Sequence, residues 1–157
     1  MNNLITYSPE RLLLLAGRHR SSAEYFRKSA YITTEENLIE LFNRLATERE
    51  HFAQQLEALL SGNPLSKMSG KKPLGHLGKV WRKMKTALII NLRARIIENV
   101  RQTEKSALKR TRRLLESENL PTSVLIILEQ HRNELESSVQ QLRNERKRAK
   151  YRTARAA

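Results

Sequence analysis

Four polar residues lie on the apolar faces of four predicted helices, each close to the midpoint of its helix. They are two histidines and two glutamates, namely His19, Glu48, Glu104 and His131. Carboxylates and imidazoles at one level inside a helical bundle suit a buried metal site, whereas an ordinary apolar core excludes them. With His51 on the flank of the second helix, they are candidate ligands for iron, manganese or zinc.

A metal-free arrangement of the same residues is the alternative. Glu48 and Glu104 can pair with His19 and His131 through charge-assisted hydrogen bonds, forming a polar layer that fixes the register of the helices. Both interpretations require Glu104 to be buried. Both also place the two glutamates within hydrogen-bonding or metal-bridging distance of a histidine.

The elements that must position these residues are helices. Apolar residues recur three or four positions apart in four long stretches, which predicts amphipathic helices, and no strand pattern competes with them. The predicted ranges are 8–30, 35–60, 90–117 and 122–146. A short amphipathic helix carrying Trp81 is expected near 76–88, inside the long connection between the second and third long helices.

The lengths of the connections predict the topology. About four residues join the first helix to the second and the third to the fourth, so each pair should form an antiparallel hairpin. A long crossover joins the two hairpins, which is the ferritin-like arrangement of a four-helix bundle. We therefore expect an all-α bundle domain over residues 1–146, followed by a basic C-terminal tail over 147–157.

Several short motifs carry a resemblance that covers roughly residues 4–146. The motifs are Ser22-Ala23-Glu24-Tyr25-Phe26-Arg27, His51-Phe52-Ala53, Gly62-Asn63-Pro64, Gly75-His76-Leu77-Gly78-Lys79-Val80-Trp81 and Glu104-Lys105-Ser106-Ala107-Leu108-Lys109. With these motifs the chain resembles an uncharacterised bacterial family of ferritin-like four-helix-bundle proteins, a domain of unknown function. The resemblance implies the fold and implies no activity.

A second resemblance concerns the metal ligands. Glu48-Arg49-Glu50-His51 resembles the Glu-x-x-His step of ferritin-like di-iron proteins. The first helix departs from that pattern because Ala23 stands where a carboxylate is expected. The fourth helix has the step in reverse order, as His131-x-x-Glu134. About half of the ligand set is present, so a single-metal site is the expectation and a di-iron centre is not.

Charge is distributed unevenly along the chain. Residues 1–61 hold seven Lys/Arg and eight Glu, whereas residues 62–157 hold twenty-three Lys/Arg and eight Glu, for a net charge of +14. Such asymmetry favours an anionic partner, which can be nucleic acid or another polyanion, bound without sequence preference, or an anionic membrane surface. A solvated helix face with a basic end is the alternative. The candidate anion-binding residues are Lys79, Arg82, Lys83, Arg146, Lys147 and Arg148.

The composition excludes several kinds of chemistry. The absence of cysteine excludes disulfides, thiolate zinc sites and thiol catalysis, and the chain also lacks aspartate and a Gly-rich phosphate loop. We expect a cytoplasmic protein without a signal peptide or membrane span, and a homo-oligomer is compatible with the sequence. The favoured function is a non-enzymatic, stress-associated bundle protein with a cationic surface; the alternative is a metal-binding ferritin-like protein.

Overall fold

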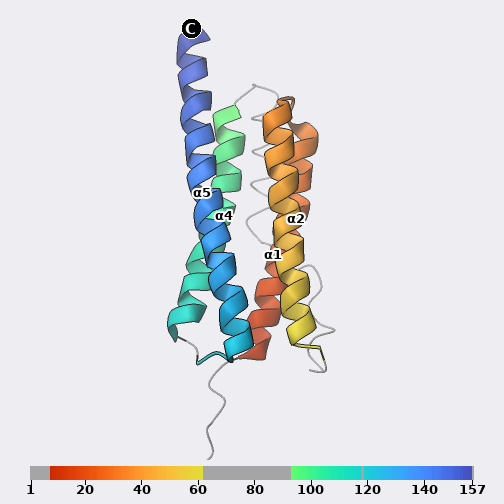
Figure 1. Cartoon of the computed structure of the whole chain (residues 1–157). Helices are drawn as coiled ribbons and strands as arrows, with labels where there is room; N and C mark the ends of the chain where they lie inside the picture. Colours follow the sequence, from red (N-terminus) through yellow and green to blue (C-terminus); the bar gives the residue numbers. More distant parts are fainter. Residues whose placement is uncertain (1–7, 62–92, 118, 157) are drawn as a thin grey trace, which may run out of the picture.

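Four long helices make up the part of the chain that the computed structural model describes, residues 8–61, 93–117 and 119–156. Helix α1 runs antiparallel to α2, and α4 runs antiparallel to α5, so the helices pack in two pairs (Figure 1). This confirms the predicted all-α architecture with two hairpins. The helices span Pro9–Ile32 (α1), Glu36–Leu59 (α2), Arg93–Ser117 (α4) and Thr122–Ala156 (α5). The predicted crossover, the short helix near 76–88 and Trp81 lie outside the described residues.

Local sequence signals set the ends of the first helix. The side chain of Ser8 accepts a hydrogen bond from the backbone N–H of Arg11 at 3.4 Å, and Pro9 occupies the first turn. Both are favoured at a helix N-terminus, because the cap satisfies a free N–H and proline lacks one. At the other end the N–H of Thr33 donates to the carbonyl of Ser29. Only residues 33–35 then separate α1 from α2, which forces the antiparallel hairpin.

The apolar core is divided into two main parts along the bundle axis. One part is built around Phe26, Phe42, Ile97 and Leu142, and the other around Leu12, Phe52, Leu56, Leu114 and Leu128. On every helix the residues of these two clusters are separated by a buried polar position. The antiparallel pairing brings these positions to one level, and the buried polar residue on α2 is Arg49 rather than the expected Glu48.

Helix α5 is longer than predicted. Its expected end was residue 146, but the helix continues to Ala156, and Figure 1 shows it projecting past the other helices. The reason is that residues 147–156 contain no glycine or proline and are rich in lysine, arginine and alanine, which are good helix formers. The expected tail therefore begins inside a helix. Its first turns also pack on the bundle, because Ala149 is buried.

None of the described helices combines the length and the apolarity that a bilayer span requires.

Candidate functional site

Arg49 of α2 lies at the centre of the polar layer, and its side chain has no exposed surface. Its Nη1 atom lies 3.1 Å from Nδ1 of His131 on α5, and its Nη2 atom lies 3.2 Å from Oε2 of Glu48. Its Nε atom lies 3.4 Å from Oε1 of Glu104 on α4. A single guanidinium group thus contacts three of the four residues that the sequence singled out.

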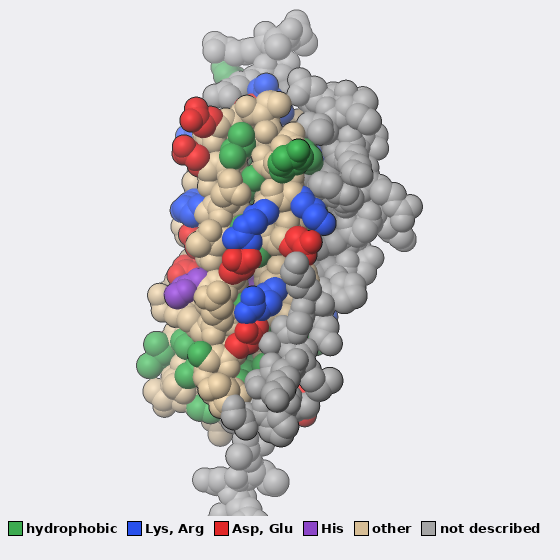
Figure 2. Space-filling view, turned by 90° about the vertical axis from the view of Figure 1, so that its right-hand side faces the viewer, with side chains coloured by type: hydrophobic (Ala, Val, Ile, Leu, Met, Phe, Trp, Pro, Cys, Tyr) green, Lys and Arg blue, Asp and Glu red, His purple; other side chains and the backbone are tan. Residues whose placement is uncertain are grey.

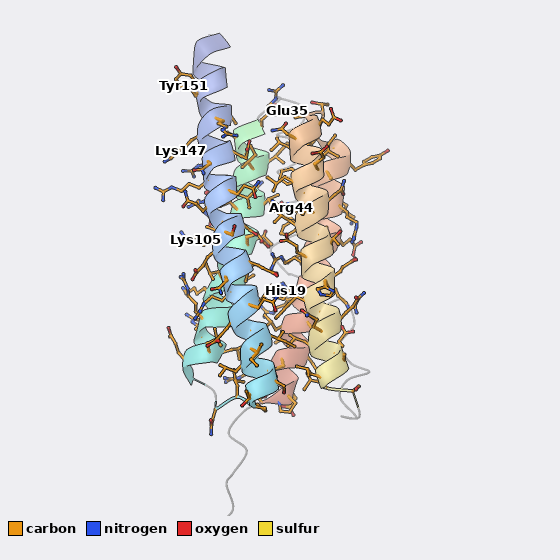
Figure 3. The ribbon with its side chains drawn as sticks, viewed as in Figure 1. His19, Glu35, Arg44, Lys105, Lys147 and Tyr151 are labelled. Atoms are coloured by element: carbon orange, nitrogen blue, oxygen red, sulfur yellow. The ribbon has the colours of Figure 1, made fainter. Side chains whose placement is uncertain are left out.

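The two histidines of the layer contact each other directly. Nε2 of His131 lies 3.1 Å from Nε2 of His19, and each side chain is only 1% exposed. Phe52 stacks on the His131 ring with a centroid distance of 3.4 Å, and its ring meets His19 edge-on at 4.9 Å. Figure 3 shows His19 at mid-height in the bundle. The imidazoles are therefore held in fixed orientations by an aromatic ring from α2.

Both histidines are neutral at pH 7. Burial lowers the pKa of His19 well below its usual 6.5, and the positive charge of Arg49 lowers it further. Burial is also the main cause of the lowered pKa of His131, with His19 and Arg49 as further causes. A neutral imidazole has one donor and one acceptor nitrogen, so the pair can share a single hydrogen bond without placing two charges together.

Glu104 titrates close to neutral pH. Its side chain is fully buried, and burial raises its pKa from 4.5 to about 7, although the nearby charge of Arg49 acts in the opposite direction. The hydroxyl of Ser138 would also lower this pKa, but it donates to the carbonyl of Glu134 at 2.9 Å. Among the described residues, neither carboxylate oxygen of Glu104 has a hydrogen-bond partner of good geometry. The layer thus contains a carboxylate that is incompletely solvated by the protein.

The arrangement differs from the expected direct contacts between glutamates and histidines. The prediction that Glu104 is buried is confirmed. Both glutamates, however, contact Arg49, and the arginine stands between the carboxylates and His131. Glu48 lies at the edge of the layer with its side chain 29% exposed, and His51 is exposed on the surface.

The layer does not fit a resident iron, manganese or zinc ion. A metal ligand must offer a lone pair, whereas the guanidinium of Arg49 offers only donors and a positive charge. Arg49 also contacts Oε1 of Glu104 and Nδ1 of His131, which are atoms that would face a metal. Within residues 8–61, 93–117 and 119–156, no group of three or more histidines and glutamates has the arrangement of a metal site.

Arg49 was the residue that sequence reasoning missed, although a signal for it exists. The apolar stripe of α2 includes Leu45, Phe52 and Leu56, with an interval of seven between the first two. Arg49 fills that interval at four residues after Leu45 and three before Phe52, which is the spacing of a core position. Its charge concealed the pattern, because arginine is almost never fully buried without a partner.

Within the part of the chain that the structure describes, the charge imbalance follows the division into hairpins. The α1–α2 hairpin, residues 8–61, holds seven Lys/Arg and eight Glu, whereas residues 93–117 and 119–156 hold sixteen Lys/Arg and seven Glu. Figure 2 shows a face on the α1–α2 side where basic and acidic side chains are interspersed. The α1–α2 hairpin contains the ion pairs Arg20–Glu57, at 2.7 Å, and Arg27–Glu50. Among the described residues, the unbalanced positive charge belongs to the α4–α5 hairpin, and residues 62–92 of the sequence carry a further seven Lys/Arg and no Glu.

The predicted anion-binding residues have different environments. Arg146 donates to Oε2 of Glu98 at 2.8 Å, and Arg148 donates to Oε1 of Glu145 at 3.0 Å. Lys147 is exposed. The other three predicted residues, Lys79, Arg82 and Lys83, lie outside the described residues.

The fold and the layer define an all-α bundle protein with a buried Arg–His–Glu network. Residues 10–117 match a family described as a domain of unknown function (DUF2383), and the chain belongs to this family. The matched range contains His19, Arg49 and Glu104 but ends before α5, which supplies His131. No curated protein and no solved structure matches the chain.

Proposed function

We propose that this protein is a non-enzymatic bundle protein that binds polyanions, nucleic acid in particular, through the α4–α5 hairpin. The observation that carries the proposal is the separation of charge between the two hairpins. Sixteen Lys/Arg against seven Glu on the described part of α4 and α5 create a positive field, whereas α1 and α2 are almost neutral. A field of one sign on one side attracts a polyanion and orients it.

The C-terminal part of α5 is the sharpest feature of this surface. We call residues 143–156 the α5 arm; they hold seven Lys/Arg and one Glu on a continuous helix. Arg143 and Lys147 are exposed and stand one helical turn apart, and neither has a carboxylate partner among the described residues. Lys105 of α4 and Lys147 project on the same outer side of the hairpin (Figure 3). Cations at helical spacing can contact successive phosphates of a nucleic acid backbone.

The polar layer supports a structural role in this proposal. His19, Arg49, Glu104 and His131 are all buried, so a polyanion on the surface does not reach them. A buried polar network whose members contact one another only in one alignment favours one register of the four helices. The layer thereby fixes the register of α4 relative to α5, and with it the relative positions of their cationic side chains.

We also propose a ferritin-like connectivity and a cytoplasmic location in a bacterial cell. The support for the connectivity comes from the helix ends. In Figure 1, α2 ends at one end of the bundle and α4 begins at the opposite end. A connection between opposite ends of a bundle is the long crossover of ferritin-like folds.

Paired substitutions test which hairpin binds. The double variant Arg143→Gln/Lys147→Gln removes two positive charges from the α5 arm, and Lys28→Gln/Arg44→Gln removes two from the α1–α2 hairpin. In a mobility-shift titration on duplex DNA at low salt, the first variant should bind several-fold more weakly and the second should bind like the wild type. Equal losses in both, or no binding by the wild type, would refute the proposal.

Substitution is a cleaner test here than truncation. Deletion of residues 144–157 would remove the Arg146–Glu98 ion pair and the buried Ala149, so it would also loosen the packing of α5 on α4. Arg143 and Lys147, in contrast, are exposed, and their replacement leaves the core unchanged.

A further inference from the structure

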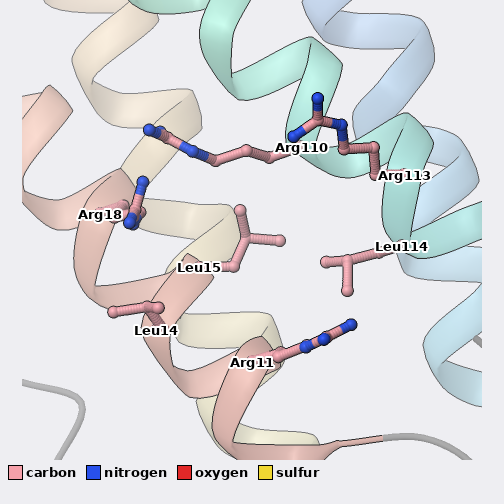
Figure 4. A pocket seen from close by; sticks show the side chains of 7 residues that line it. All are labelled: Arg11, Leu14, Leu15, Arg18, Arg110, Arg113 and Leu114. Atoms are coloured by element: carbon pink, nitrogen blue, oxygen red, sulfur yellow. The ribbon is translucent and has the colours of Figure 1, made fainter.

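A cleft with an unusual lining lies between α1 and α4, which pack less closely than the helices within either hairpin. It has a volume of about 180 Å³ and is lined by four arginines and three leucines: Arg11, Arg18, Arg110, Arg113, Leu14, Leu15 and Leu114. Figure 4 shows Arg18 and Arg110 approaching each other from the two helices, with the three leucines beneath them in this view. No acidic side chain of the described residues lines the cleft.

The positive charge of this cleft is not compensated at Arg18 and Arg110. Neither guanidinium has a carboxylate partner among the residues that the structure describes. Burial lowers the pKa of Arg110 below its usual value, and the charges of Arg18 and Arg113 lower it further. A bound anion would remove this repulsion, because it would stand between cations that are partly withdrawn from water.

A smaller cavity continues the cleft towards the polar layer. It shares Leu15, Arg18 and Arg110 with the cleft, and His19 also lines it. Its volume is about 10 Å³, which is about the space that one water-sized group needs. Nδ1 of His19 is buried and has no hydrogen-bond partner among the described residues. A buried polar atom without a hydrogen-bond partner destabilises the folded state, so a ligand atom that pairs with this nitrogen would be stabilising.

The hydrogen bonds of the layer determine whether Nδ1 of His19 is a donor or an acceptor. Arginine only donates, so the nearest nitrogen of His131, Nδ1 at 3.1 Å from Arg49, must be the acceptor. His131 then carries its proton on Nε2 and donates it to Nε2 of His19. His19 must therefore carry its own proton on Nδ1. The inner end of the cleft thus presents a third donor in addition to the two arginines.

We propose that the cleft between α1 and α4 binds a small carboxylate that carries a hydrocarbon group. The carboxylate lies between Arg18 and Arg110, and one of its oxygens accepts the Nδ1–H of His19. The hydrocarbon group packs on Leu14, Leu15 and Leu114. Guanidinium groups match the two oxygens of a carboxylate, and a cavity of about 150 Å³ is known to admit a benzene ring. This site is independent of polyanion binding by the α5 arm.

Four probes of related structure test the chemistry of the site. Calorimetric titration of the full chain should show binding of hexanoate with one site per chain. Acetate has the head group without the hydrocarbon, hexanol has the hydrocarbon without the charge, and hexylamine has the opposite charge. Each of these should bind at least about tenfold more weakly than hexanoate. Equal binding of hexanol and hexanoate, or no binding of hexanoate at millimolar concentration, would overturn the proposal.

Two substitutions and a control locate the site. Arg110→Gln should weaken hexanoate binding about tenfold or more. The melting temperature should stay unchanged or rise, because a repelled cation is removed. Leu14→Trp should also abolish binding, because Leu14 is 40% exposed and a larger side chain there would fill the cleft without disturbing the core. Arg95→Gln, on an exposed position of α4 outside the lining, is the matched control and should bind like the wild type.

A spectroscopic measurement reports on the inner end directly. Hexanoate should shift the ¹⁵N resonance of His19 Nδ1, because its N–H acquires an acceptor. The shift should be absent in the Arg110→Gln variant at the same hexanoate concentration. Binding that survives both Arg110→Gln and Leu14→Trp, or that leaves the His19 resonance in place, would contradict the assignment.

Discussion

Nε of Arg49 lies 3.4 Å from Oε1 of Glu104, and neither side chain has any exposed surface. The pair joins α2 to α4, which belong to different hairpins. A buried ion pair adds little net stability, because desolvation of both charges offsets their attraction. Removal of one partner is different, because the other charge then stays buried and unpaired. The pair therefore favours one alignment of the two hairpins more than it stabilises the fold.

Replacement of Arg49 by methionine should destabilise the protein by about 3–5 kcal/mol, because the buried Glu104 loses the cation that lies 3.4 Å from it. Methionine has a similar length and can fill most of the space. The measurement is urea unfolding at pH 7.5. The double variant Arg49→Met/Glu104→Leu should recover most of this loss, since no charge then remains buried without a partner. Losses that simply add in the double variant would show that the two residues do not interact.

The raised pKa of Glu104 predicts a specific pH dependence. The pKa is about 7 in the folded protein and 4.5 when the group is solvated, so between these values the folded state binds more protons than the unfolded state. Its contribution to the free energy of unfolding therefore falls as the pH rises from about 4.5 to about 7, by an amount on the order of 3 kcal/mol. Glutamine does not titrate, so wild type minus Glu104→Gln isolates this effect.

The two histidines act in the opposite direction and must be cancelled in that comparison. Their folded pKa values lie well below 6.5, so below pH 6.5 the unfolded state binds more protons and their contribution to stability falls. Both proteins of the comparison contain these histidines. The difference in unfolding free energy should thus move in favour of the wild type as the pH is lowered from 7.5 to 5. A difference that stays constant would place Glu104 in a solvated environment.

The hydrogen-bond direction in the layer predicts two different tautomers. His131 should be protonated on Nε2, and His19 on Nδ1, with both rings neutral at pH 7. Long-range ¹H–¹⁵N correlation spectra distinguish the tautomers by the ¹⁵N shifts of the two nitrogens. The Phe52 ring stacked on His131 should also shift the ring protons of that histidine. Observation of the same tautomer in both residues would reverse the direction of the bond.

Zinc, manganese and ferrous iron should not bind stoichiometrically in the polar layer. Arg49 contacts the His131 and Glu104 atoms that would be ligands, so a divalent cation would have to displace this arginine from a buried position. Elemental analysis of untagged protein after metal supplementation is the measurement, with the histidine spectra as a second readout. One equivalent of metal together with shifts of both His19 and His131 would contradict the arginine-centred layer.

Much of the fold could be predicted because apolar spacing and short connections act locally. The stripe through Phe26 or through Leu45 defines a helix face, and three linking residues permit only an antiparallel neighbour. The end of α5 could not be placed in the same way. Beyond Leu142 the apolar pattern fades, and helix propensity together with the buried Ala149 and the Arg146–Glu98 ion pair carries the helix to Ala156.

The polar layer shows where prediction from residue types stops. The burial of His19, Glu104 and His131 follows from their positions within apolar stripes. The identity of their partners depends on how four helices meet, which no single stripe determines. Arg49 is fully buried because a carboxylate from α4 and an imidazole from α5 contact it, and both neighbours are distant in the sequence.

The salt dependence of DNA binding tests the central claim most directly. Each neutralised phosphate releases counterions, so the logarithm of the binding constant should fall linearly with the logarithm of salt concentration. We predict a steep slope for the wild type, similar on two unrelated duplex sequences, and a slope smaller by about 2 for Arg143→Gln/Lys147→Gln. Negligible binding by the wild type at about 50 mM salt, or identical slopes for the two proteins, would contradict polyanion binding through the α5 arm.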